Sequence, residues 1–217
     1  MPPVELPPLP DHLAEEAAAA LGWDGIVLPP MTLLGRRVVV VAELLVDVHF
    51  NRLTMGWGPV TDRVSVGTWS WPELAGRAPE PAVLISGVLA PARHWRTALT
   101  YVAPFGGLAP TAMLLPPGPA RDPECLLQAD YYGAAVLASV DGNMVDRVDG
   151  NMVDSNMVDR ADGNTADCNM VDRVDSNMVD MVQAGRSGRL ATACSTTICR
   201  WVYEIVYDRV LAELAAI

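Results

Sequence analysis

A chain of 217 residues that is 51% hydrophobic holds enough apolar material for one buried core, so we expect one domain with an irregular insert. Its formal net charge of −11 argues against a protein whose main task is to bind the phosphate backbone of nucleic acids. All fifteen basic residues are arginine, which is typical of a GC-rich bacterial genome, and the lack of lysine excludes Walker A, Schiff-base and kinase-type chemistry.

The chain begins with a Pro-rich segment at 1–10, which we expect to be an extended tail because it has neither the basic start nor the apolar stretch of a secretion signal. Helix formers from Asp11 to about Leu21 predict a helix that Gly22 ends. A short strand follows and stops at Pro29. No apolar run is long enough to span a membrane, so we expect a cytoplasmic protein without membrane contact.

The strongest strand signal is a strict alternation over 42–51, in which the even positions are apolar and the odd positions are mostly polar. On such a strand the side chains of Glu43, Asp47 and His49 would share one face. The stretch RVSVGTWSW at 63–71 predicts a second strand, which would pair with the first as a hairpin.

The second half alternates between helical and strand-like patterns. The expected elements are a strand or buried helix at 82–90, a helix at 92–102, a strand at 111–115, a helix from Asp122 to Tyr132 ended by Gly133, strands at 134–140 and 181–185, and an amphipathic helix from about Thr197. This order predicts an α/β or α+β fold, built on a single mixed sheet of about five strands that is flanked by helices.

Three nearly identical units of thirteen residues follow one another at 143–155, 156–168 and 169–181. They contain nine Asp and three Arg, and therefore carry six of the eleven net negative charges. A period of thirteen keeps no constant face on a helix or on a strand, and the units hold no aromatic residue, Leu or Ile. We therefore predict that they form an acidic loop without a core of its own.

The segments on either side of the repeats predict two strands of one hairpin. Without the repeats, Asp141 and Gly142 would form a favoured two-residue turn between those strands. We therefore predict a repeat loop at 143–180 inserted in a hairpin of one α/β domain made of 11–142 and 181–217. Tandem duplication at a hairpin tip explains the repetition, because such tips tolerate insertion.

Calcium binding is the alternative role for the repeats. The pattern D-x-x-D-x-N-x-x-D from Asp146 to Asp154 recurs from Asp159 to Asp167, and clustered oxygen atoms are what calcium prefers. However, the spacing of an EF-hand and the Gly-Gly-x-Gly-x-Asp repeat of calcium β-rolls are both absent.

Glu43, Asp47 and His49 are the candidate metal ligands, since carboxylate and imidazole groups on one strand face could share a divalent ion. The alternative is a solvated polar face of a strand. The order helix, short strand, helix, strand in the second half resembles restriction-endonuclease-like domains. The Glu-x-Lys part of that active site cannot be completed without lysine, so the resemblance implies a degenerate relative.

Two further candidates concern binding. Arg186 and Arg189 lie on a glycine-containing loop ahead of the C-terminal helix and could hold an anion, although a plain loop has the same composition. Trp69 and Trp71 would share one strand face, which would be a partner surface if exposed and core if covered.

No complete catalytic set emerges, so the leading hypothesis is a non-enzymatic interaction or regulatory domain with a protein partner and no cofactor. The alternative is a metal-dependent hydrolase, in its nuclease form a degenerate restriction-endonuclease-like protein, that would use a divalent metal held by Glu43, Asp47 and His49.

Overall fold

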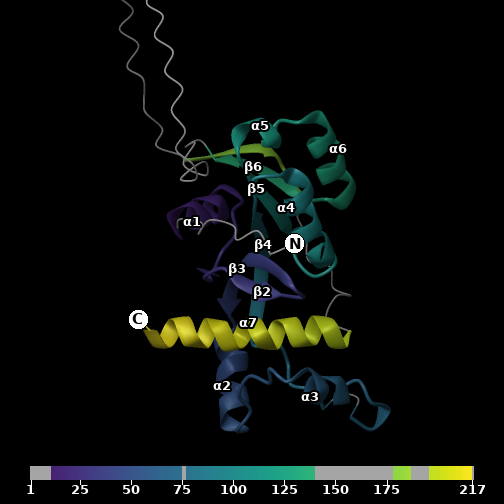
Figure 1. The fold of residues 1–217 in the computed structure, drawn as a ribbon. Helices are drawn as coiled ribbons and strands as arrows, with labels where there is room; N and C mark the ends of the chain where they lie inside the picture. Colours follow the sequence, from purple (N-terminus) through teal and green to yellow (C-terminus); the bar gives the residue numbers. More distant parts are fainter. Residues whose placement is uncertain (1–10, 75–76, 140–177, 187–195, 217) are drawn as a thin grey trace, which may run out of the picture.

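The computed structural model describes residues 11–74, 77–139, 178–186 and 196–216, which form a single mixed sheet with helices packed around it (Figure 1). The strands are β1 (Ile26–Val27), β2 (Met31–Leu33), β3 (Arg36–Leu44), β4 (Val83–Pro91), β5 (Thr111–Leu115), β6 (Ala135–Ser139) and β7 (Val179–Gln183). The helices are α1 (Asp11–Ala20), α2 (Val46–Thr54), α3 (Arg63–Thr68), α4 (Trp95–Val102), α5 (Pro117–Ala120), α6 (Pro123–Tyr132) and α7 (Thr197–Ala216), with 3-10 turns η1 (Pro72–Leu74) and η2 (Ala103–Phe105).

The sheet combines an antiparallel and a parallel part. Its strand order is β1-β3-β4-β5-β6-β7, and β2 also pairs with β3. Strand β3 is antiparallel to β1, β2 and β4, whereas β4, β5 and β6 are parallel and are joined through α4 and α6. Parallel neighbours need such helical crossovers. The predicted α/β fold with one mixed sheet is therefore confirmed, with seven strands in the described residues.

Helices cover both faces of the sheet. On one face, Ala90, Met113 and Leu115 pack with α4 and α6, and the same face continues into a cluster with α7. On the other face, Leu89 and Leu114 pack against α1. Because both faces are covered, β5 and β6 are buried along their whole length, which explains why each contains only one polar residue, Thr111 and Ser139.

Several predicted elements are confirmed where local signals are strong. In α6, the Asp122 side chain accepts a hydrogen bond from the Glu124 amide, Pro123 opens the first turn, and Gly133 ends the helix with φ +73°. Helix α7 begins at Thr197 as predicted, and two apolar residues near its ends, Ile198 and Leu214, are exposed. The segment 82–90, for which the sequence predicts a strand or a buried helix, is strand β4.

None of the described helices is long and apolar enough to cross a membrane.

The two strands beside the repeats pair with each other. Strands β6 and β7 are antiparallel, with Ser139 opposite Val179. The buried Val179 already belongs to β7, so this strand begins two residues before its predicted start at 181. Residues 140–177, and with them most of the predicted repeat loop and the calcium alternative, lie outside the described residues, as does the predicted tail at 1–10.

The predicted strand over 42–51 is wrong beyond Leu44. Strand β3 ends there, Leu45 lies at the helix N-cap, and Val46–Thr54 form α2. No side chain caps the start of α2, so the usual start signal is missing. The apolar residues also fit a helical spacing, since Val46, Phe50 and Leu53 are i, i+4 and i+7, and the tertiary contacts of α2 select the helix.

The predicted strand over 63–71, and its hairpin with the first, are also wrong. Residues Arg63–Thr68 form α3, and Asp62 is the N-cap, whose side chain accepts a hydrogen bond from the Ser65 amide. The β-branched residues Val64, Val66 and Thr68 favour a strand. The cap outweighs that preference, and D-x-x-S was the overlooked signal.

The register of β6 and β7 makes a test of the insertion possible. Deleting 143–177 joins Gly142 to Met178, which would place Val140 opposite Met178 and leave Asp141 and Gly142 as a two-residue turn. If the repeats add no packing, the shorter connection saves up to about 2 kcal/mol of loop-closure entropy. We expect an unchanged or higher melting temperature by calorimetry, and a lower one would refute the insertion hypothesis.

Candidate functional site

The three residues of the predicted metal site do not share a face. Glu43 is exposed on β3, whereas Asp47 and His49 lie on α2, where residues two apart point about 200° apart. The Nδ1 atom of His49 lies 2.6 Å from the phenol oxygen of Tyr207 on α7. Among the residues that the structure describes, no three His, Cys, Asp or Glu side chains are placed to hold a metal ion. The prediction that these three side chains share one face of a strand is therefore wrong.

The predicted anion site is only partly described. Arg189 lies outside the described residues. The side chain of Arg186 lies against Gly133, and its Nη2 donates to the Tyr131 carbonyl at 3.4 Å. Arg186 therefore contacts the end of α6, and its role as an anion ligand stays a prediction.

The tryptophans of the predicted partner surface lie at the end of α3 and do not alternate on a strand. Trp69 is the C-cap of α3 and is half-buried. Trp71 exposes 58% of its surface, and Trp57, in the connection between α2 and α3, is also exposed. Of the two predicted residues, Trp71 is therefore exposed and Trp69 is not, and their role as a partner surface stays a prediction.

A buried ion pair joins α2 to α7. Arg52 donates from Nη1 and Nη2 to the two carboxylate oxygens of Glu204, both at 2.8 Å, and each side chain is only 4% exposed. Such a two-pronged pair is the strongest geometry for these groups. The two residues are 152 positions apart, so sequence patterns give no sign of their contact.

The pair also ties down the chain between α2 and β4. Arg52 donates to the carbonyls of Gly58 and Glu80, at 3.0 and 3.3 Å, and Glu204 accepts from the amide of Val60 at 2.9 Å. A buried charge is stable only when such bonds replace its hydration. Among the side-chain atoms of Arg52 and Glu204, only the Arg52 Nε is buried without a hydrogen-bond partner; elsewhere in the described residues the Nε of Arg93 is the other such atom.

Tyr207 completes this cluster. Its ring lies under the guanidinium of Arg52, 4.8 Å from the ring centroid, and its hydroxyl bonds His49. Burial raises the pKa of Tyr207, the charge of Arg52 lowers it, and the charge of Glu204 raises it, with a net increase. The polar groups of the cluster are thus engaged with one another, as in a structural network.

We call residues 46–71 the α2–α3 arm, because α7 lies between it and most of the sheet (Figure 1). Two contacts hold its far part on the first turns of α7. Trp201 donates from its indole nitrogen to the Thr61 carbonyl at 2.7 Å, and the hydroxyls of Ser70 and Thr197 lie 2.7 Å apart. The arm is therefore attached to α7 along its length.

The outer face of α2 is apolar although it faces solvent. Val46, Phe50 and Leu53 are 66%, 67% and 52% exposed and lie on one side of the helix, opposite Val48 and Arg52. Helix α2 thus carries side chains fit for burial on two faces. A search of this segment for helical as well as strand periodicity would have found the stripe.

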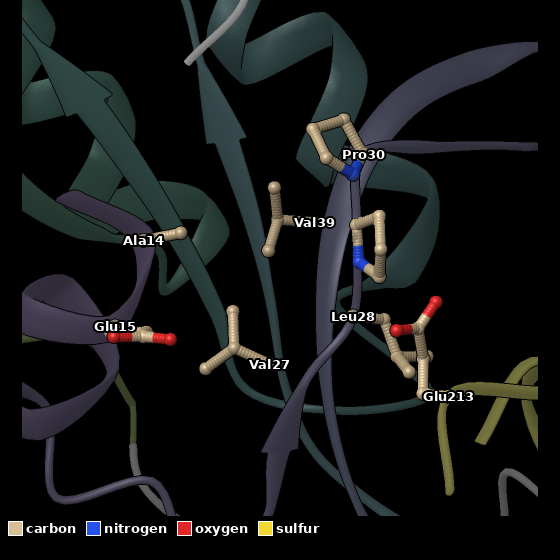
Figure 2. Close-up of a pocket in the computed structure, with 8 residues that line it drawn as sticks. Ala14, Glu15, Val27, Leu28, Pro30, Val39 and Glu213 are labelled. Carbon is tan, nitrogen blue, oxygen red and sulfur yellow. The ribbon is translucent and has the colours of Figure 1, made fainter. Parts of the chain in front are cut away.

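Two of the pockets that described residues line lie beside α1 and beside α4. One of about 270 Å³ lies between α1, the start of β2 and the end of α7, and is lined by Ala14, Glu15, Val27, Leu28, Pro29, Pro30, Val39 and Glu213 (Figure 2). The other, of about 520 Å³, lies where β4 and β5 end, and is lined by His94, Trp95, Arg96, Gly118, Pro119 and Asp122.

The buried pair predicts strong coupling between Arg52 and Glu204. Removing one partner leaves the other charge buried and unpaired, so we expect Arg52→Met or Glu204→Leu alone to lower the free energy of unfolding by about 3–5 kcal/mol. The double variant should lose less unfolding free energy than the two single variants lose together, by at least about 1–3 kcal/mol. Urea titrations of the four proteins measure this, and simple additivity would contradict the pair.

The raised pKa of Tyr207 predicts a loss of stability in alkali. The folded state holds the phenol proton more tightly, so the contribution of Tyr207 to stability is constant below about pH 10, the ordinary tyrosine pKa, and falls as the pH rises beyond it. Unfolding free energies from pH 9 to 11 should fall less in Tyr207→Phe than in wild type. Tyr131→Phe, which removes an exposed phenol, is the control and should follow wild type.

Cys125 also lowers stability in alkali, and comparing the variants with wild type cancels this effect. Burial, together with the charge of Asp122, raises its thiol pKa to about 11, and the effect is present in all three proteins. Equal slopes in wild type and Tyr207→Phe would therefore contradict the role of Tyr207.

Comparisons of the chain with protein-family models, with curated proteins and with solved structures each found no match.

Proposed function

We propose that this chain is a non-enzymatic interaction domain and that the α2–α3 arm presents its partner-binding surface. The observation that carries the proposal is where the exposed large apolar side chains gather. Among the described residues there are thirteen, and seven belong to the arm: Val46, Phe50, Leu53, Met55, Trp57, Val64 and Trp71. Apolar side chains concentrated on one exposed segment mark an interaction site.

The partner that suits this surface has an apolar groove. Val46, Phe50 and Leu53 are spaced i, i+4 and i+7 on α2, which is how a helix presents its anchors to a groove in another protein. Aromatic side chains such as Phe50 and Trp57 also bring large contact area at low entropic cost. The acidic chain as a whole makes an anionic membrane surface a poor alternative.

The rigid attachment of the arm supports the same function. A binding helix loses less entropy on association when its position is already set. The Arg52–Glu204 pair and the Trp201–Thr61 bond set the position of the arm before any partner arrives. A free arm would instead have to order on binding.

The alternative of a metal-dependent hydrolase has lost its geometric basis. It depended on Glu43, Asp47 and His49 meeting on one strand face, and His49 instead bonds Tyr207. No observation on the described residues favours it over the interaction domain.

The test compares two matched surface variants of the full chain. Phe50→Gln with Leu53→Gln alters the arm, and Leu127→Gln with Tyr131→Gln alters two similarly exposed residues of α6. Exposed changes of this kind shift stability by about 0.5 kcal/mol or less, so both variants should melt like wild type.

We expect affinity capture from the native cell lysate, quantified by mass spectrometry, to recover a protein with wild type and with the α6 variant. The arm variant should recover at least about 10-fold less of it, because central apolar anchors each contribute about 2 kcal/mol or more. Recovery of the same proteins at equal levels by both variants would overturn the proposal.

A further inference from the structure

The hydroxyl of Tyr207 hydrogen-bonds one group among the described residues, the imidazole of His49. The Tyr207 oxygen and the His49 Nδ1 lie 2.6 Å apart, and the two rings meet edge to face with their centroids 5.7 Å apart. Tyr207 is fully buried, so water cannot replace His49 as the partner of the hydroxyl. A buried hydroxyl proton that finds no acceptor is costly, so this contact with α2 matters to the position of the arm.

The buried hydroxyl also requires one protonation state of His49. Tyr207 can donate to Nδ1 only when that nitrogen carries no proton, which means a neutral imidazole with its proton on Nε2. In the other neutral tautomer, Nδ1–H would donate to the phenol oxygen and the O–H of Tyr207 would be buried without an acceptor. The attached arm is therefore built around a neutral His49 with a free Nδ1.

Protonation of His49 disturbs this contact in two ways. Both imidazole nitrogens become donors, so the O–H of Tyr207 loses its acceptor. A positive charge also appears against a ring that already lies 4.8 Å from the guanidinium carbon of Arg52. The carboxylate of Glu204 is engaged by Arg52 and by the Val60 amide. The cluster therefore gains a net positive charge at a site largely removed from water, which is unfavourable.

The other charged groups around α2 lie in water. They come from α2 itself, from α7 beside Tyr207, and from the segments that precede α2 and β4, and all are exposed: Asp47, Asp208, Arg209, Glu43 and Glu80. Solvent and salt screen exposed charges, so these groups offset little of the effect inside the cluster. Arginine and tyrosine side chains do not change charge between about pH 5 and 8, which leaves the imidazole as the group of the cluster that does.

We propose that protonation of His49 loosens the α2–α3 arm from α7, so that the position of the arm responds to pH. The attached arm binds this proton less well than the loosened arm. Attachment is therefore complete at the alkaline end of the range from about pH 8 to 5 and weakens as the pH falls through it. Any effect on partner binding rests on the proposed function, whereas the loosening itself does not.

The experiment follows amide hydrogen exchange of the full chain by mass spectrometry at about pH 7.5 and 5.5, with rates corrected for the intrinsic effect of pH. A helix of nine residues is marginal in water, so α2 exchanges faster once it loosens from α7. We expect the protection of α2 to fall at least about fivefold at the lower pH, because one buried donor loses its acceptor. Peptides from β5, in the middle of the sheet, should keep their protection.

Two variants separate His49 from the other histidines. His49→Asn places a neutral amide oxygen near the position of Nδ1, where it can accept from Tyr207 at every pH, so the protection of α2 should no longer fall. His94→Asn changes an exposed histidine at the start of α4 and should respond to pH like wild type.

Four results would overturn the inference. Protection of α2 that is equal at the two pH values would show that the arm does not respond. An equal fall in His49→Asn would assign the response to another group, and an equal fall in β5 would show unfolding of the whole domain. NMR of the imidazole nitrogens near pH 7.5 should find the proton of His49 on Nε2 in the wild-type chain, and a proton on Nδ1 would remove the acceptor on which the inference rests. A negative lysate capture would change none of these results, so the two proposals fail separately.

Discussion

The buried ion pair between Arg52 and Glu204 is the constraint on which the arm depends. Two charges removed from water are tolerated only when they meet with good geometry and find further hydrogen bonds, and here the backbone of residues 58, 60 and 80 supplies those bonds. A small displacement of α2 along α7 would break several of these bonds at once. The pair therefore specifies one position of the arm, which apolar packing alone would define less sharply.

Helix α7 holds the arm in place relative to the sheet. Its first half bonds the arm through Trp201, Glu204 and Tyr207. On the same helix, Val206 and Val210 pack on the sheet. The burial of α7 against the sheet therefore fixes the position of the arm and of the apolar outer face of α2.

Elements with complete local signals were predictable. The helix after Asp122 has an N-cap, a proline in its first turn and a glycine at its end, and each of these acts on the neighbouring backbone. The strands β5 and β6 are apolar except for one polar residue at an end of each, Thr111 and Ser139, and they lie between turn signals, which suits strands covered on both faces. For the two predicted tryptophans, the exposure of Trp71 was one of two alternatives that the sequence left open, and the strand assigned to 63–71 is replaced by helix α3.

The sequence by itself determined the α/β class, the mixed sheet and the helix from Thr197, because these follow from local apolar periodicity and turn chemistry. Only the tertiary structure decided that Val46–Thr54 is a helix. The alternation there fits a strand, and the helix is stabilised by Glu204 and Tyr207, more than 150 residues away. Long-range contacts of this kind leave no periodic trace in the sequence.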